Sequence, residues 1–201
     1  AASVCTARIT LTPGTGLRKD ALNLNEVRLY RKGSNAMIPT DKLRAVLSSQ
    51  YQRHPAAPDS MFAAANCIDG DIGPGLNGEV ACHTLDQDHG DLSPQLNVTF
   101  PCPTTKALDA VSKVEVFNRG DCCQERILAY QLQLIDGDKT TIAQAFPFNT
   151  QEAMYTFVTA GRWRHALLYV CTHTCLLGVC WDMCAFVHRV RGRRPARVEI
   201  L

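Results

Sequence analysis

Two arginines, two acids and two adjacent cysteines lie within one short stretch of this chain. The stretch is Asn118-Arg119-Gly120-Asp121-Cys122-Cys123-Gln124-Glu125-Arg126. Each guanidinium offers a planar fork of hydrogen-bond donors to a polar ligand. Adjacent cysteines, if joined, close a strained ring that presents a flat and polarizable surface. An apolar platform flanked by directed donors suits a sugar, which has one hydrocarbon face and a rim of hydroxyls.

The composition is that of a globular protein from an oxidising compartment. The 201 residues are 46% hydrophobic and 20% charged, which excludes a disordered chain. The formal net charge of +2 gives no reason to expect a nucleic-acid partner. Ten cysteines are many for a cytosolic protein of this size, so we expect a secreted, extracellular protein. The chain begins Ala1-Ala2-Ser3 without a signal peptide, which indicates a processed protein or an excised fragment.

Short segments with apolar residues at every second position predict β-strands. These segments are 7–11, 22–30, 96–100, 114–117 and 130–135. Turn sequences separate them, and Asp136-Gly137-Asp138 is typical of a hairpin. Residues 66–90 are rich in Gly, Pro and Asn and predict an irregular, functional loop. Many short strands joined by turns predict an all-β fold, either an antiparallel sandwich or a jelly roll.

Three pieces of the sequence, in this order along the chain, resemble the F-type lectin family. They are Asn66-Cys67-Ile68-Asp69-Gly70, Cys82-His83-Thr84 and the stretch from Arg119 to Ile127. The similarity extends over about 45–157, and the third piece also resembles modules of green-algal extracellular proteins. The family comprises the fucolectins, so the resemblance implies a discoidin-like β-sandwich jelly roll over 43–160. Residues 1–42 would then be N-terminal strands, and 161–201 an atypical cysteine-rich tail.

The resemblance implies a site for fucose or a related sugar. It assigns hydrogen bonds with the sugar to His83, Arg119 and Arg126. It implies a vicinal disulfide, Cys122–Cys123, that packs against the sugar. The supporting carboxylates that would hold the arginines are Asp121 and Glu125. His89 lies in the same loop as His83 and is an alternative to it.

The sequence departs from the family at one strand entry. Pro94 is followed by Gln95-Leu96-Asn97, where the family has two tryptophans. The missing aromatic residues favour an alternative function, that of a structural matrix or adhesion module which keeps the fold without binding sugar. The tripeptide Arg119-Gly120-Asp121 also matches an integrin-type adhesion motif.

The resemblance also implies a structural calcium ion. Its loop ligands correspond to Asn66, Asp69, Asp71 and Ala81, several through backbone oxygens. The alternative is that Asp69 only caps a turn. Arg197 lies where the family has a ligand glutamate, but Glu26 holds the matching position in an N-terminal segment that resembles the same strand. The first thirty residues are therefore either the tail of a preceding repeat or strands that complete the domain, as in a circular permutant.

The tail admits four interpretations, and we expect no strand alternation in it. Residues 166–187 contain four cysteines: Cys171, Cys175, Cys180 and Cys184. With His173 and His188 they could bind zinc, or the segment could span a membrane, although Asp182 would then lie in the bilayer. Two further disulfides on an appendage poor in strands are a third interpretation. The fourth is a translated intron or a shifted reading frame.

We expect a binding function and no catalysis. The sequence contains no nucleophile–base pair or phosphate loop, and the acids Asp86 and Asp88 lie in a loop without a partner motif. The expected partners are fucosylated or related glycans, with no nucleic acid and no membrane. Single sugar sites are weak, so repeats or oligomers would supply avidity. The chain could also be the binding module of an enzyme whose catalytic part lies outside it.

Overall fold

The computed structural model describes residues 3–13, 21–52, 60–73 and 81–159, and the backbone of three further strands at 167–176, 179–188 and 198–199. The chain divides into two compact units, unit 1 (Ala1–Thr159) and unit 2 (Ala160–Leu201). Unit 1 consists mainly of β-strands in two antiparallel sheets, which confirms the predicted all-β class. Its helical segments are short: η1 (Thr40–Lys42), η2 (Ala64–Cys67), η4 (Gln87–His89), α1 (Ala107–Ala110) and η5 (Gln124–Ala129).

The first sheet has five strands, and β1 lies at its centre. In spatial order the strands are β3 (Arg44–Leu47), β5 (Gln95–Cys102), β1 (Ser3–Leu11), β7 (Tyr130–Ile135) and β8 (Ile142–Pro147). Each pairs with its neighbours in antiparallel fashion, and Ile9 of β1 lies opposite Leu96 of β5 and Leu132 of β7.

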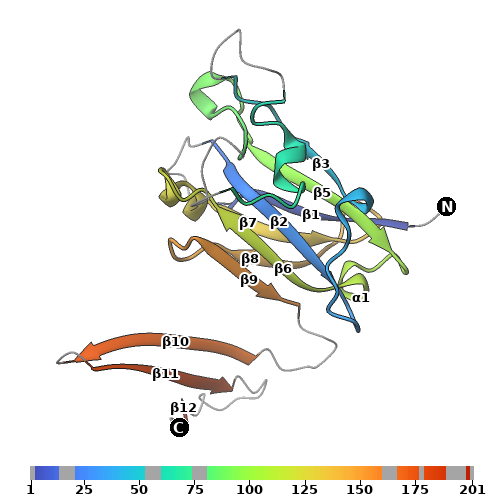
Figure 1. The fold of residues 1–201 in the computed structure, drawn as a ribbon. Coiled ribbons are helices and arrows are strands. Elements are labelled where there is room, and N and C mark those ends of the chain that lie inside the picture. Colours follow the sequence, from blue (N-terminus) through green and yellow to red (C-terminus); the bar gives the residue numbers. More distant parts are fainter. Residues whose placement is uncertain are drawn as a thin grey trace. The chain divides into compact units, whose positions relative to one another are not determined.

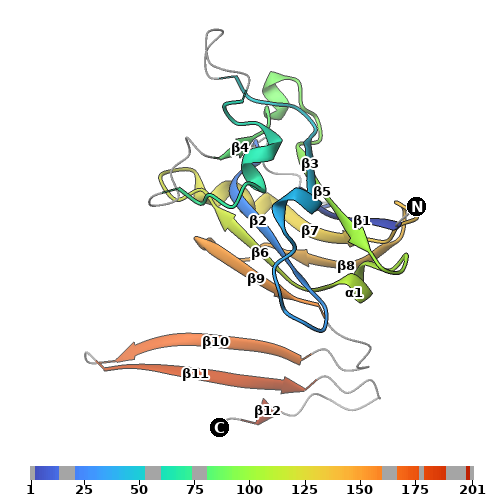
Figure 2. The same cartoon turned by 45° about the vertical axis from the view of Figure 1, so that its right-hand side comes forward.

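The second sheet has four strands, and β2 is an inner strand of it. The spatial order is β4 (Cys82–His83), β2 (Asn23–Arg31), β6 (Val111–Asn118) and β9 (Met154–Val158). The two sheets form separate layers of unit 1 (Figures 1 and 2). The first thirty residues therefore contribute an inner strand to each layer.

One hydrophobic core lies between the layers. Alternate residues of β1 are buried, namely Cys5, Ala7 and Ile9, as the sequence pattern of that strand predicts. The second sheet contributes Leu29 and Val116 to the same cluster. The packing of two apolar sheet faces against each other makes unit 1 a β-sandwich.

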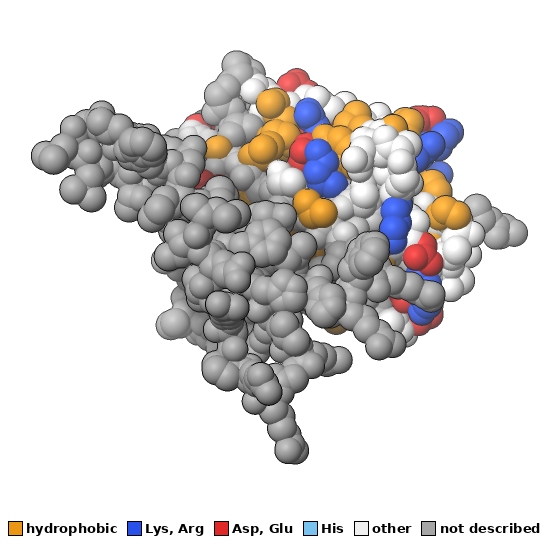
Figure 3. Space-filling view, turned by 90° about the horizontal axis from the view of Figure 1, so that it is seen from below, with side chains coloured by type: hydrophobic (Ala, Val, Ile, Leu, Met, Phe, Trp, Pro, Cys, Tyr) orange, Lys and Arg blue, Asp and Glu red, His pale blue; other side chains and the backbone are white. Residues whose placement is uncertain are grey.

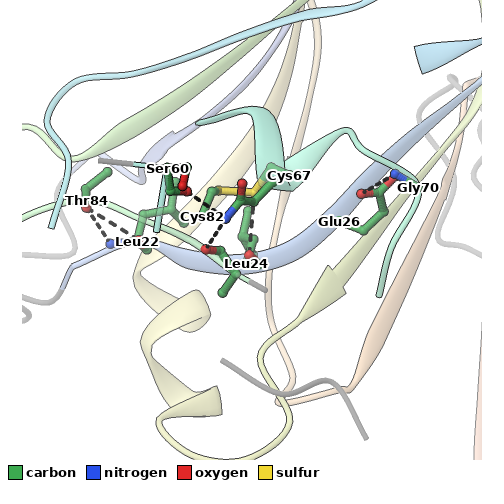
Figure 4. The surroundings of a disulfide bond; sticks show 10 residues. Leu22, Leu24, Glu26, Ser60, Cys67, Gly70, Cys82 and Thr84 are labelled. Carbon is green, nitrogen blue, oxygen red and sulfur yellow. Dashed lines mark hydrogen bonds between the residues drawn. A yellow bond between two sulfur atoms is a disulfide. The ribbon is translucent and has the colours of Figure 1, made fainter. Parts of the chain in front are cut away.

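Two disulfides cross-link segments of unit 1. Cys5–Cys102 joins β1 to β5 at the edge of the core. Cys67–Cys82 joins η2 to β4, and Figure 4 shows it beside Leu24 of β2. The second bond therefore ties the loop that precedes His83 to the sheet that carries this histidine.

The surface of unit 1 is mixed in character. On the face in Figure 3, hydrophobic, basic and acidic side chains of the described residues are interspersed. Exposed large apolar residues include Val158 of β9 and Ile142 of β8, both on edge strands. Among the described residues, none of the helices has the length and apolar character that a membrane crossing requires.

Unit 2 corrects the expectation that the tail lacks strands. It contains a three-stranded antiparallel sheet in the order β10 (Leu167–Leu176), β11 (Val179–His188) and β12 (Val198–Glu199). The alternation is hard to recognise because cysteine commonly ranks with the apolar residues, although here it alternates together with His and Asp. When Cys, His and Asp are taken as one class, they occupy every second position over 171–175 and again over 180–184.

Candidate functional site

Asn118, the last residue of β6, organises the loop that carries the predicted sugar-binding arginines. Its side chain is 0% exposed. Nδ2 donates to the carbonyl oxygens of Gln124 at 3.0 Å and Glu152 at 3.2 Å, while Oδ1 accepts from the backbone N–H of Arg119 at 2.9 Å. Gln124 closes the loop further, because its Nε2 donates to the carbonyl of Gly120 at 2.9 Å. One buried amide thus fixes both ends of the loop to the sheet.

Arg119 is held by Asp121 in a two-pronged ion pair. Nε donates to Oδ1 at 2.6 Å and Nη2 donates to Oδ2 at 2.9 Å. The interaction with Asp121 raises the pKa of Arg119, so its guanidinium carries a charge at every relevant pH. Both side chains are partly exposed, so the pair orients the guanidinium more than it stabilises the fold.

Cys122 and Cys123 are free thiols in the structure, so the vicinal disulfide implied by the resemblance is not formed here. Burial, followed by a hydrogen bond with the Cys123 thiol, raises the pKa of the Cys122 thiol, while the charge of Arg119 opposes the rise. Cys123 has a φ of 59°, in the left-handed region that non-glycine residues rarely occupy. The two sulfurs are close enough to interact without being bonded.

Arg126 and Glu125 lie in η5, immediately after the cysteines. The backbone N–H of Arg126 donates to the carbonyl of Cys123 at 3.2 Å, and the Arg126 side chain is half-buried. Glu125 is exposed in the first turn of the same helix. The short helix sets the direction in which Arg126 leaves the loop.

His83 comes from β4, in a distant part of the sequence. Its side chain is buried, with 7% exposed. Nδ1 lies 2.6 Å from the carbonyl oxygen of Thr84. Because a carbonyl only accepts, Nδ1 carries the proton and Nε2 is left as an acceptor in the neutral ring. Burial lowers the pKa of His83, as do the charges of Arg126 and Arg119.

The structure therefore places His83 within electrostatic range of both predicted sugar-binding arginines. The charges of Arg119 and Arg126 both lower the pKa of His83, although β4 and the loop that carries the arginines are far apart in the sequence. His89, the alternative histidine, is exposed, and its Nδ1 lies 2.6 Å from Oδ1 of Asp86. Asp86 in turn interacts with the charge of Arg126. This position of Asp86 was not predicted, because its loop carries no recognisable motif.

Two aromatic residues that lie beside His83 were also not predicted. The ring centroid of Tyr51 lies 4.7 Å from that of His83, and the ring of Phe62 lies 5.7 Å from it, edge to face. Phe62 has a φ of 65°, a strained value for a bulky residue. Two of the four described non-glycine residues with positive φ, Phe62 and Cys123, thus lie at this site. Tyr51 is exposed enough for a ligand to touch.

Glu26 lies on β2 beside the loop predicted to bind calcium. Its side chain is only 1% exposed. It accepts from the backbone N–H of Gly70 at 3.3 Å (Figure 4) and lies 3.8 Å from Nε of Arg28. Burial raises the pKa of Glu26 from 4.5 to about 7, and the negative charges of Asp69 and Asp71 add to the rise. A cation at this position would relieve the burial cost and the repulsion together.

The other predicted calcium ligands lie in the same loop. Asn66 donates from Nδ2 to the carbonyl of Ala81 at 3.4 Å. Oδ1 of Asp69 accepts from the backbone N–H of Asp71, and Oδ1 of Asp71 accepts from that of Gly73. Each aspartate therefore caps a turn with one carboxylate oxygen. Within the described ranges, no group of three or more His, Cys, Asp or Glu side chains is arranged to hold a metal. A hard cation here would need backbone or amide oxygens as well.

This arrangement can recognise a small polar ligand. The guanidinium groups supply donors, the neutral imidazole supplies an acceptor, and the aromatic rings and sulfurs supply apolar surface. No known protein family, curated protein or solved structure matches this chain.

Proposed function

We propose that unit 1 is a non-catalytic carbohydrate-binding module for fucose or a related sugar. The observation that carries this proposal is the electrostatic influence of both Arg119 and Arg126 on the buried imidazole of His83. The histidine of β4 and the two arginines of the loop after β6 thus come from two separate segments, and Tyr51 and Phe62 lie beside the histidine. Such convergence beside an apolar surface is typical of small-molecule sites.

The chemistry of the three polar groups suits hydroxyl recognition. A sugar hydroxyl both donates and accepts, so it needs partners of both kinds. Arg119 and Arg126 only donate, while the lowered pKa of His83 keeps its imidazole neutral and able to accept. Asp121 keeps the donors of Arg119 in a fixed direction. Charge-assisted donors are the stronger ones, which makes the arginines the main source of affinity.

The apolar face of the sugar has two candidate contacts. Tyr51 lies beside His83 and supplies the exposed aromatic surface that Pro94-Gln95-Leu96 lacks, and the buried ring of Phe62 packs against it. Cys122 and Cys123 supply the second surface, and we propose that they join when the protein is exported. Cys5–Cys102 and Cys67–Cys82 support an oxidising, extracellular location. The proposed partners are fucosylated glycans, with avidity supplied by repeats or oligomers.

We further propose that calcium stabilises the loop before His83. Glu26 would hold the ion, together with oxygens of Asp69, Asp71, Asn66 and Ala81. The ion would supply positive charge to a buried carboxylate with acidic neighbours. Because Cys67–Cys82 ties this loop to β4, calcium would act on the sugar site by fixing His83.

A second candidate is a structural matrix or adhesion module without sugar binding. The burial of His83 favours this alternative, because a side chain that is 7% exposed offers little surface to a ligand. Its contacts with Thr84, Tyr51 and Phe62 would then serve only to pack the loop.

A glycan-array screen of the oxidised protein with calcium tests both candidates. We expect binding to fucosylated or related deoxy-sugars, lost in Arg126→Ala. Arg44→Ala is the matched control, because Arg44 is an exposed arginine on β3, a strand of the other sheet. Absence of binding by wild-type protein with an intact fold would favour the structural module. Equal loss in both variants would show a general effect of charge instead of a site.

A further inference from the structure

The two long strands of unit 2 place four cysteines in two opposite pairs. β10 and β11 form an antiparallel hairpin in which Cys171 lies opposite Cys184 and Cys175 lies opposite Cys180. Successive residues of a strand belong to alternate faces of the sheet. The spacing of four residues therefore places both pairs on the same face of the hairpin.

We infer that two cross-strand disulfides, Cys171–Cys184 and Cys175–Cys180, close this hairpin. Directly opposite residues of an antiparallel pair have Cα atoms roughly 4.5–5.5 Å apart. That separation falls within the range of about 4.4–6.8 Å that a disulfide spans. Hydrogen-bonded and non-hydrogen-bonded positions alternate along such a pair, so two positions four residues apart are of the same kind. The two cysteine pairs therefore have the same backbone geometry, so if one pair can form a disulfide, the other can as well.

The register excludes the other pairings that these four cysteines could form among themselves. Positions four residues apart on one strand are separated by about 13 Å, which no disulfide spans. A single zinc ion bound by all four cysteines is excluded for the same reason, because its sulfur ligands would lie roughly 3.8 Å apart. His173 lies opposite Asp182 between the two pairs. Zinc held by this pair and one cysteine pair is the remaining arrangement, and zinc content distinguishes it from the disulfides.

The size of unit 2 supplies an independent reason for covalent closure. The unit spans Ala160–Leu201. A segment of about 40 residues rarely buries enough apolar surface to be stable, and small domains of this length commonly rely on disulfides or metals. Unit 1 of the same chain already contains Cys5–Cys102 and Cys67–Cys82. An environment that oxidises those cysteines would also oxidise the four cysteines of unit 2.

Each bond forms by thiol–disulfide exchange with a small disulfide oxidant such as glutathione disulfide. Two cysteine thiols give up two protons and two electrons as the sulfur–sulfur bond forms. One glutathione disulfide is reduced to two glutathione thiols in the same exchange. Two exchanges complete the ladder and lower the mass of unit 2 by that of four hydrogen atoms.

The first test is non-reducing peptide mapping of the full chain after folding in a glutathione redox buffer. Trypsin cleavage after Arg164 and Arg189 releases one peptide with all four cysteines. We expect that peptide to be four hydrogens lighter than its reduced form and to resist alkylation. Chymotrypsin then cuts on both sides of Cys180, after Leu177 and Trp181 among other sites, and the three fragments that contain cysteine should remain joined. Release of the fragment that holds Cys171 and Cys175 would overturn the proposal.

Two single variants of the full chain locate the partners. Cys171→Ala should expose one thiol, which alkylation and mapping place at Cys184. Cys175→Ala should expose one thiol at Cys180. A new thiol at any other position of unit 2, four alkylatable thiols in the wild-type tryptic peptide, or one zinc ion per chain that a chelator releases would each overturn the two disulfides; thiols at Cys122 and Cys123 are counted separately.

Discussion

The guanidinium of Arg119 is aligned with the carboxylate of Asp121 through two hydrogen bonds, at 2.6 Å from Nε and 2.9 Å from Nη2. A planar fork held in this way has its remaining N–H groups directed elsewhere. The pair is partly exposed, so its contribution to the free energy of unfolding is below about 1 kcal/mol. Its role is therefore to fix a direction for the donors of Arg119.

Asp121→Asn tests that role. The asparagine amide offers one acceptor and turns a donor toward the guanidinium, so the orientation of Arg119 is lost. We expect affinity for the glycan identified by the array to fall about tenfold, equivalent to about 1.4 kcal/mol, with little change in thermal stability. Isothermal titration calorimetry measures the first effect and thermal unfolding the second. Asp41→Asn, at an exposed pair with Lys42, should alter neither.

Asn118→Ala should weaken the whole loop. The substitution removes one acceptor and two donor interactions of a fully buried side chain, and it leaves carbonyl oxygens without these partners. We expect the free energy of unfolding to fall by about 1–3 kcal/mol. Denaturant titration measures the change. Gln151→Ala loses only an exposed hydrogen bond to Gln124 and serves as the control. A loss no larger than that of the control would contradict the assigned role of Asn118.

Glu26→Gln should stabilise the calcium-free protein near neutral pH. The pKa of Glu26 is raised from 4.5 to about 7, so its stabilising contribution is present below pH 4.5 and is lost as pH rises through 7. Glutamine stays neutral, so the variant should gain stability relative to the wild type across that window, by at most about 3 kcal/mol. Denaturant titration in a chelator from pH 4 to 8 measures the difference, and Glu152→Gln, an exposed acid, should show none.

The same variant should lose the response to calcium. If Glu26 holds the ion, calcium raises the melting temperature of the wild type and does so far less in Glu26→Gln. Differential scanning calorimetry with and without calcium measures the shift. A variant that keeps the full shift would place the ion elsewhere or rule it out.

His83→Ala and His89→Ala should separate the two candidate histidines. Only His83 interacts with both arginines, so we expect sugar binding to disappear in His83→Ala and persist in His89→Ala. The lowered pKa of His83 predicts the pH profile as well. Its folded-state pKa lies below 6.5, so protonation of His83 disfavours the folded protein, and the contribution of His83 to stability and to binding should decline as pH falls below 6.5. Binding retained by His83→Ala would falsify the assignment.

Strands were predictable where alternation is clear. The predicted segment 130–135 matches β7 at both ends, and the alternating residues of β1 are buried as expected. β9 was not predicted, because Met154-Tyr155-Thr156-Phe157-Val158 carries apolar residues on both faces of an edge strand. The cysteine spacings of β10 and β11 mirror each other, with Cys171 and Cys175 opposite Cys184 and Cys180, so the sequence already held a signal for this pairing.

A motif predicted the local part of the candidate site, and the family resemblance added His83 from a distant strand. Arg119, Asp121, Cys122, Cys123 and Arg126 are neighbours in sequence, and a motif suffices to find them. Tyr51 and Phe62 reach His83 through chain folding alone, and neither lies at a fixed spacing from it. A free or bonded state of adjacent cysteines depends on redox conditions, which residue types do not specify.

The inner position of β1 has a consequence for biosynthesis. β1 is synthesised before the other strands of its sheet, and its partners β5 and β7 follow about ninety or more residues later. Contacts of such long sequence separation slow folding and leave early strand edges exposed. Cys5 likewise remains a reactive thiol until Cys102 has been synthesised and the two can form their disulfide. We therefore expect a ribosome-bound chain that ends before β7 to depend on chaperones, and a fragment lacking β1 to aggregate instead of folding.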